Sequence, residues 1–515
     1  MSILKGILKY GLILIALLVG AAFVMGAVMV LVPSVSFLGV RYAKVEQKGN
    51  GYEIVDAKDI SGITSIKVNA DMYNVVVMQN NTSQLSVRVM LDAIGFYKTQ
   101  YKEVLEDGEK VEVAKTVDET FMPQTNIADI KRGSTELVIN ANPVEGALSF
   151  TNREIVIKLP SGAANLRGIQ IESTDGKISL ENVSTTDLTM KSAAGDQTLT
   201  NVKVLGKFTS ESRKGALKVG VSEGANASAY SLNGPEVTIK NAFGDVTFAD
   251  GINIGDSSND KLVITNDKAT IKLNNVEANF KYTGEAGLVN IKTTRGEVDI
   301  ESNDAKFNID TIAGSSYGFK AVGEGMLTLN IGELNVNTAF ISTSSGAVDI
   351  QRLKGDEVTS ITTKTGNVTV KNVYRSVIVN TKSGNITMAQ PASGATRDIT
   401  ITANTEKGIV DLTKIVCAVN ASATSGSVKV SALEVNGDIN VQTELGVCEV
   451  LLPIATFDLV TSAAGKVTVK DLAVTVNTNA LTTSHINHTE AECSDKHTVT
   501  VKSSGADVVV TGIVR

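Results

Sequence analysis

Apolar and polar residues alternate in short runs between residues 61 and 165. The runs at 63–68, 73–78 and 85–89 follow this pattern, and turn residues separate them. A period of two between turn clusters is typical of β-strands with one buried face. Residues 96–132 interrupt the alternation with a polar insertion, which we interpret as a protruding hairpin or loop. We therefore predict an N-terminal β region over 61–165.

From about residue 166 to the C-terminus the alternation acquires a fixed period. A typical unit contains Ser or Thr, two further residues and a Gly, followed by alternating apolar residues, as at 343–350 and 381–388. A fixed period indicates stacked units that bury their apolar positions against one another. We predict an all-β fold in which residues 166–515 form a single-stack β-solenoid of about 19–20 residues per coil. Hairpins folded into sandwiches are the alternative, although they require no constant turn spacing.

Glycines mark the period in three runs. Within each run, successive glycines lie 18 to 20 residues apart. The runs are Gly176, Gly195 and Gly215, then Gly346, Gly366 and Gly384, then Gly408, Gly426, Gly446 and Gly465. We expect each Gly to supply a positive φ at a tight turn, which costs other residues about 1 kcal/mol or more.

Asparagine is a second marker of the coils. Asn182, Asn201 and Asn372 each lie six residues after a repeat Gly, and each is followed by Val. Asn tolerates left-handed backbone conformations, and stacked Asn side chains hydrogen-bond along a ladder. We expect both properties at these positions.

A long apolar run precedes the β-rich part of the chain. Residues 11–32 include no charged side chain over 22 positions, a length of about 33 Å as a helix, against a bilayer core about 30 Å thick. Signal peptides usually have shorter apolar cores, so we predict a retained transmembrane helix at 11–33. A short segment at 1–10 precedes it, and a polar linker at 34–60 follows.

The orientation of this helix depends on its flanking charges. Lys5 and Lys9 before the run are nearly balanced by the basic residues that follow it. Because a first uncleaved helix most often acts as a signal anchor, we expect a single-pass cell-membrane protein whose large domain is extracytoplasmic. Its bilayer contact would be residues 11–32. Cleavage near Ala21 and Ala22 is the alternative.

Composition narrows the classes of function. Lys and Arg total 48 against 55 Asp and Glu, a net charge of −7, so no basic surface for nucleic acid is expected. Aromatic residues make up 4% of the chain and Trp is absent, which argues against stacking clefts for sugars or bases. Three cysteines provide no disulfide framework.

All three histidines lie close to a cysteine near the C-terminus. His485, His488, Cys493 and His497 have the spacing H-x2-H-x4-C-x3-H within 484–497. Imidazole and thiolate are ligands of zinc and copper, so these four residues are a candidate metal site. The alternative is a polar surface loop, because the spacing matches neither a zinc finger nor a metalloprotease helix.

Carboxylates are weaker candidates for chemistry. Carbohydrate-cleaving enzymes use paired carboxylates, and Asp299 and Asp349 each lie three residues after a Gly, which places them at one coil position. Thr369 and Thr387 interrupt that position in the following coils.

Two further segments depart from the repeat. An acidic loop at 250–260, with Asp250, Asp256 and Asp260 beside Asn259, lacks the regular alternation of a calcium loop. The interval from Gly465 to Gly505 is 40 residues, which we interpret as two coils with one marker missing.

One stretch carries a family resemblance. The run Ile-Val-Ile-Lys-Leu-Pro at 155–160, followed after a spacer by the first Gly-turn coil at 166–180, resembles the bacterial putative-adhesin β-solenoid domain family of unknown function. The resemblance covers about 60–515. It implies a solenoid fold, often behind an N-terminal membrane span, and a role in adhesion without catalytic residues.

These observations favour a membrane-anchored, non-catalytic β-solenoid that acts as an adhesin-like or envelope scaffold protein. Its expected partner is a cell-surface polymer or protein. A metal-binding or envelope stress-sensing module that uses the His/Cys loop is the alternative. A solenoid enzyme acting on polysaccharides is a weaker one.

Overall fold

The described part of the chain is built from β-strands. The computed structural model describes residues 40–55, 62–79, 85–106, 109–119, 127–141, 147–160, 166–453, 457–472, 475–476, 484–485 and 497–513. One 3-10 helix, η1 (Ala227–Ala229), accompanies the strands there. The predicted transmembrane segment at 11–33 lies outside these residues, and none of the helices within them is long and apolar enough to cross a membrane.

The chain divides into two compact units, Met1–Glu181 and Asn182–Arg515. In the first unit, parallel strands stack in the orders β7-β2-β9 and β8-β3-β10. Its strands are β1 (Val40–Val55), β2 (Ser65–Asp71), β3 (Asn74–Gln79), β4 (Leu85–Glu106), β5 (Glu109–Glu119), β6 (Ala128–Arg132), β7 (Glu136–Ala141), β8 (Ala147–Leu159), β9 (Gly168–Ser173) and β10 (Ile178–Glu181). The coil β2–β3 therefore lies between two coils that follow it in sequence.

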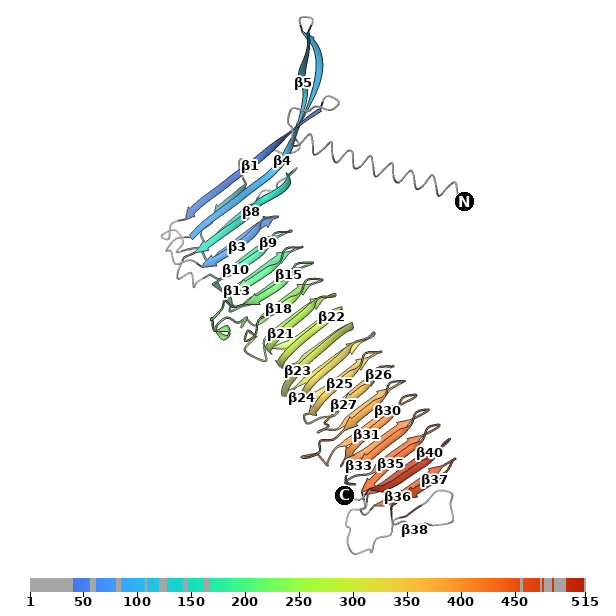
Figure 1. The fold of residues 1–515 in the computed structure, drawn as a ribbon. Helices are drawn as coiled ribbons and strands as arrows, with labels where there is room; N and C mark the ends of the chain where they lie inside the picture. Colours follow the sequence, from blue (N-terminus) through green and yellow to red (C-terminus); the bar gives the residue numbers. More distant parts are fainter. Residues whose placement is uncertain are drawn as a thin grey trace, which may run out of the picture. The chain divides into compact units, whose positions relative to one another are not determined.

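Antiparallel strands cover one end of both stacks in this unit. Strand β6 pairs with β7, while β4 pairs with β8 and β1 pairs with β4. Such a cover blocks the exposed edge on which another chain would pair. The segment interpreted as a polar insertion contains the long hairpin β4–β5, in which Tyr97 opposes Glu119, followed by β6 (Figure 1).

The second unit is a stack of coils with two long parallel faces. We call the stack of first strands face A and the stack of second strands face B. Face A contains β12 (Asp187–Ser192), β15 (Lys207–Ser212), β17 (Glu236–Asn241), β20 (Lys261–Asn266), parts of β22 (Asn279–Arg295), β23 (Val298–Gly323) and β24 (Thr328–Thr343), then β26 (Thr359–Thr363), β28 (Val377–Thr381), β30 (Thr400–Thr405), β32 (Ala418–Ala423), β34 (Ile439–Thr443), β40 (Thr498–Ser503) and β36 (Asp458–Ala463).

Face B is formed by the strand that follows each turn. It contains β13 (Gln197–Thr200), β16 (Leu217–Gly220), β18 (Val246–Phe248), β21 (Thr270–Glu277), the remaining parts of β22, β23 and β24, then β25 (Val348–Lys354), β27 (Val368–Val370), β29 (Ile386–Ala389), β31 (Val410–Ile415), β33 (Val428–Ala432), β35 (Cys448–Pro453), β41 (Val508–Ile513) and β37 (Val467–Lys470).

A shorter third row of parallel pairs lies at the far corner of the coils. It includes β11 (Ser184–Thr185), β14 (Lys203–Val204) and β19 (Asn253–Ile254), with Leu232 between the last two. Separately, β38 (Thr475–Val476) and β39 (Ser484–His485) form a small antiparallel pair.

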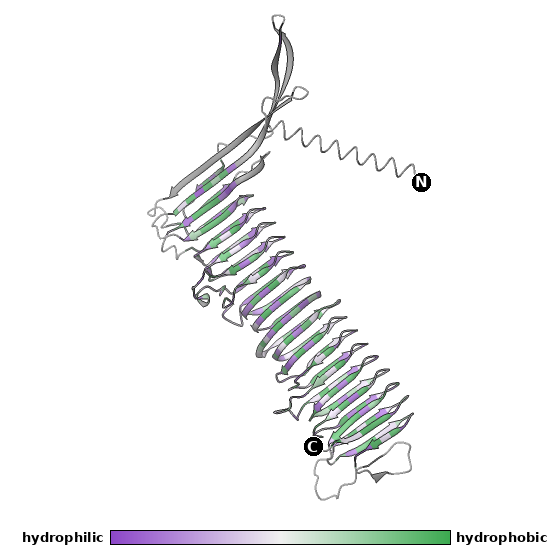
Figure 2. Ribbon diagram, in the orientation of Figure 1, coloured by the Kyte–Doolittle hydropathy of each residue, from purple (hydrophilic) through white to green (hydrophobic). Residues whose placement is uncertain are grey.

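The core is a column of alternating apolar side chains. In β28, Val377 and Val379 are fully buried while Ile378 between them points outward. Figure 2 shows the same alternation of hydrophobic and hydrophilic residues along successive strands. The prediction of an all-β repeat fold with stacked parallel strands is confirmed.

The expected reason for the repeat glycines is wrong. None of the ten glycines in the three runs, all of them described, has a positive φ. The cause is the close approach of one turn to the next. A Cβ on Gly366 would lie 2.8 Å from the carbonyl carbon of Gly346 and closer still to its oxygen, and Gly384 meets Gly366 in the same way.

At several of these turns, a Ser or Thr three residues before the Gly ties two turns together. The buried Thr443 hydroxyl accepts a hydrogen bond from the Gly446 N–H at 3.1 Å and donates one to the Gly426 carbonyl at 2.9 Å. One hydroxyl therefore closes its own turn and bonds to the coil below, which explains the spacing of Ser or Thr, two residues and Gly.

The Asn prediction is confirmed at two positions and wrong at the third. Asn182 and Asn201 have φ of 56° and 54°, and the Asn201 amide donates to the Asn182 side-chain oxygen at 2.9 Å. Asn372 has no positive φ, and its side chain instead donates to the carbonyl of Gln351.

The last coil in sequence is not the last in the stack. Strand β40 pairs with β34 on one side and β36 on the other, and β41 lies likewise between β35 and β37. The sequence indicates two coils with one marker missing between Gly465 and Gly505, but β36–β37 and β40–β41 are direct neighbours, so no further coil of the stack lies between them. The chain passes over one coil position, completes β36–β37, and returns to fill the space.

A buried arginine bridges three coils of the second unit. Arg375 is 1% exposed, and its guanidinium donates to the carbonyls of Val336 at 2.6 Å, Lys354 at 3.2 Å and Asn337. Burial lowers the pKa of Arg375 from its ordinary value, and the nearby carboxylates of Asp356 and Glu357 oppose that shift. These bonds link the coil of Arg375 to the two coils that precede it.

Candidate functional site

The structure places part of the predicted metal site. His485 ends β39, with its backbone paired to Thr475, and the His497 carbonyl accepts a hydrogen bond from the Asp458 N–H at 3.0 Å. His488 and Cys493 lie outside the described residues. Within the residues that are described, no three His, Cys, Asp or Glu side chains gather as metal ligands. The four-residue site stays a prediction.

The acidic loop at 250–260 is held by its own hydrogen bonds. One carboxylate oxygen of Asp260 accepts the backbone N–H groups of Asp256 at 3.0 Å and Ser257 at 3.1 Å. Asp250 pairs instead with Lys272. The loop thus uses the carboxylate of Asp260 to close a turn.

The expected alignment of Asp299 with Asp349 is wrong. Asp299 lies on face A, within 4 Å of both Lys281 and Lys320. Asp349 lies on face B, where the register pairs it with Asn330 and its side chain accepts a hydrogen bond from Gln351.

The reason is that two different glycines precede these carboxylates. Gly296 has a φ of 135° and lies at the corner leading into face A, against Ala278, whereas Gly346 lies at the opposite turn, between faces A and B. The two carboxylates therefore make no catalytic pair.

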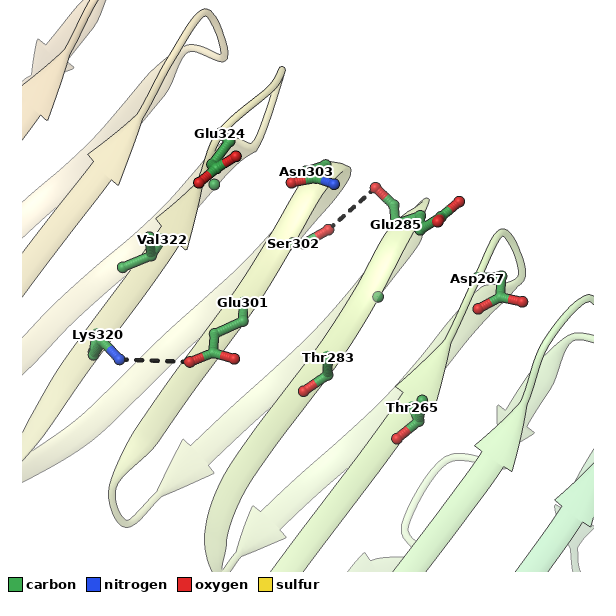
Figure 3. Close-up of a pocket in the computed structure, with 12 residues that line it drawn as sticks. Thr265, Asp267, Thr283, Glu285, Glu301, Ser302, Asn303, Lys320, Val322 and Glu324 are labelled. Atoms are coloured by element: carbon green, nitrogen blue, oxygen red, sulfur yellow. Dashed lines mark hydrogen bonds and ion pairs between the residues drawn. The ribbon is translucent and has the colours of Figure 1, made fainter.

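Face A has an acidic groove of about 560 Å³. Lys320 lies in it at 3.6 Å from Glu301 (Figure 3). Its charged lining residues are Asp267, Glu285, Glu301, Lys320 and Glu324. Four carboxylates against one ammonium make this part of the face unfavourable for anions.

A second, smaller groove of about 180 Å³ lies on face A between β30 and β40. We call it the amide groove. Its polar lining residues are Asn404, Asn420, Ser422, Asn440, Gln442, Thr500 and Lys502. It therefore offers amide and hydroxyl groups and one ammonium, with no carboxylate in its lining.

Side-chain hydrogen bonds order the amide groove across successive strands. The Asn440 amide donates to the Asn420 oxygen at 3.1 Å, and the Ser422 hydroxyl donates to the Asn404 oxygen at 2.6 Å. Asn404 in turn donates to Asn380 at 2.9 Å. These contacts hold the side chains in rows without using all of their donors and acceptors.

A comparison with protein families identifies the repeat. The family model described as Toastrack DUF4097 matches residues 63–318 and 311–511. The chain belongs to this toastrack family. The resemblance drawn from residues 155–180 is thus confirmed as to the family, while the membrane anchor stays a prediction. No curated protein matches the chain.

Solved structures similar to this toastrack chain are putative adhesins. A putative cell adhesion protein from Clostridium sporogenes is 7% identical, covering 91% of this chain and all of its own, with a TM-score of 0.14. A putative adhesin from Parabacteroides merdae is 13% identical, covering 66% of this chain and 96% of its own, with a TM-score of 0.22. One from Parabacteroides distasonis is 10% identical, covering 66% of this chain and 97% of its own, with a TM-score of 0.23. These scores are low, so the family assignment rests on the family model.

Sequence reasoning did not single out the amide groove of this toastrack chain. The signal was present as Asn at outward positions of consecutive coils, such as Asn404, Asn420 and Asn440. Thr500 and Lys502 were hidden because the returning coil β40 brings them beside β34 from 60 residues away.

Proposed function

We propose that the chain is a non-catalytic, adhesin-like or envelope scaffold protein. Residues 11–33 would anchor it in the cell membrane, and the β-repeat would be displayed outside the cytoplasm. Its partner would be a cell-surface polymer or protein bound along face A. The observation that carries the proposal is the row of outward polar side chains that register across successive coils.

Regular spacing suits these rows to an extended partner. Neighbouring strands lie about 4.8 Å apart, so each coil repeats its outward groups at that interval. The Asn404–Asn380 and Asn440–Asn420 pairs show that side chains of one row, on neighbouring strands, lie within hydrogen-bond reach of each other. An extended polymer contacting many coils gains from many individually weak hydrogen bonds.

Binding is favoured over catalysis by the chemistry of this surface. The carboxylates considered for hydrolysis lie on different faces, and Asp299 is engaged with two lysines.

Two measurements test the proposal. In intact cells, external protease should remove the region after Pro33 while a cytoplasmic control survives. The full-length protein, purified in mild detergent, should also cosediment with isolated envelope material. Protection of the region until the membrane is breached would exclude a cell-surface adhesin, and absence of cosedimentation would overturn the binding role.

A metal-binding or stress-sensing role is the second candidate, carried by the spacing of His485, His488, Cys493 and His497. Full-length protein should then hold zinc or copper near one ion per chain, and joint substitution of His485 and His488 by Ala should remove it. An unchanged metal content in the double variant would refute this role.

A further inference from the structure

We propose that the amide groove binds a linear, hydroxyl-rich glycan that carries acidic groups. This inference rests on the proposed function and names the ligand class and the position on face A. Several polar groups of the groove have no partner among the described residues: the Gln442 amide, the Thr500 hydroxyl and the Asn420 amide N–H groups. Amides and hydroxyls both donate and accept, as sugar hydroxyls require.

The charge of the groove favours an acidic ligand. Lys502 is its one charged lining residue, and in the described part of the chain no carboxylate lies within ion-pair distance of its ammonium. A carboxylate on the glycan would supply that partner, and charge-assisted hydrogen bonds are stronger than neutral ones. The acidic groove on the same face has the opposite balance and would repel this ligand.

One row of the groove, formed by Asn404, Ser422, Gln442 and Lys502, crosses four strands in register. The other row, formed by Asn420, Asn440 and Thr500, crosses three of them. With strands about 4.8 Å apart, the longer row spans about 14 Å, which fits a few sugar units of an extended chain. The inserted strand β40 supplies the hydroxyl and the ammonium, so the returning coil completes the site.

The absence of aromatic side chains from the lining defines how the sugar would be held. Stacking is the usual source of affinity for sugar rings, and here it is replaced by edge-on hydrogen bonds and one ion pair. Affinity for a short oligosaccharide should therefore be weak and sensitive to salt, because exposed ion pairs are screened.

The test uses full-length protein, with alginate as the acidic probe and dextran as the neutral one. The groove variant carries Asn420→Ala and Asn440→Ala. The matched control carries Asn308→Ala and Asn330→Ala, which removes an equivalent Asn–Asn hydrogen bond of 2.8 Å on face B. We expect alginate binding to weaken about tenfold in the groove variant and to stay within about twofold of wild type in the control.

A second variant, Lys502→Gln, separates the role of charge from folding. Lys502 is exposed at the surface, so its replacement should leave the thermal melting curve unchanged. Alginate binding should fall and lose its salt dependence, while any dextran binding stays the same. Equal binding of alginate by wild type and Lys502→Gln would overturn the acidic part of the inference.

The outcomes distinguish this inference from the proposed function. The glycan site would be overturned if the groove variant cosedimented with envelope material as well as wild type does. It would also be overturned if wild type cosedimented but did not bind alginate. Either result would leave the proposed function standing. A protein-only partner, revealed by protease treatment of the envelope material, would do the same. Absence of cosedimentation would overturn both.

Discussion

Replacing Gly366 by Ala should destabilise the coils on either side of its turn. The new Cβ would lie 2.8 Å from the carbonyl carbon of Gly346, and Cβ atoms in proteins essentially never come within 3.0 Å of a heavy atom to which they are not bonded. The obstacle is backbone, and the Val348 N–H donates to the Asn367 carbonyl at 2.9 Å across the same two coils. Relief requires these coils to separate, and comparable overpacking costs about 1–3 kcal/mol.

The assay should resolve single coils, because a stacked repeat opens locally. Hydrogen exchange of amides in 341–388 should accelerate about fivefold to 150-fold, the equivalent of 1–3 kcal/mol. Gly220→Ala is the matched control, since its nearest heavy atom would be the Ala249 Cβ at 3.9 Å and its φ is not positive. That variant should be neutral or more stable by up to about 1 kcal/mol. Equal protection in the two variants would refute the stacking explanation.

Three further predictions concern buried groups. Arg375→Met should leave buried carbonyls without donors and lower stability by about 1–3 kcal/mol; unchanged hydrogen exchange over 353–375 would contradict this. Burial raises the pKa of the Cys417 and Cys448 thiols to about 12, so neither should react with a thiol reagent at pH 8 until the protein unfolds, as mass spectrometry can check. Burial also raises the pKa of Tyr282 from 10.0 to about 12. The buried neutral phenol therefore contributes fully to the free energy of unfolding below pH 10, and this contribution is lost as the pH rises to 12. Wild type should therefore lose up to about 2–3 kcal/mol more than Tyr282→Phe in denaturation at pH 12 than at pH 9, and parallel losses would show that the phenol makes no such contribution.

The repeat could be predicted because every coil carries the same local pattern. The hydroxyl of Thr443 bonds within its own turn and to the coil below, and Gly446 leaves room for the backbone of that coil. The spacing of these two residues therefore indicates that the coils stack. The reason for the Gly could not be found from the sequence, because a positive φ and a close backbone approach both select Gly.

The order of the coils was not accessible in the same way. Residues 498–513 have the same alternation as any other coil, and no local feature states which neighbours they pair with. The faces of Asp299 and Asp349 were confused for a related reason, since Gly296 and Gly346 occupy opposite corners that look alike in sequence. The amide groove depended on the order of the coils, because Thr500 and Lys502 come from the returning coil.

The position of the returning coil has a mechanical consequence. A terminal coil at the end of a stack is peeled away by breaking hydrogen bonds one at a time along one edge. Residues 498–513 are instead bonded along both edges, to β34 and β35 on one side and to β36 and β37 on the other. A pulling force applied at the C-terminus must shear both edges together. In the first unit β2–β3 is enclosed between two coils in the same manner, so it too is bonded along both edges.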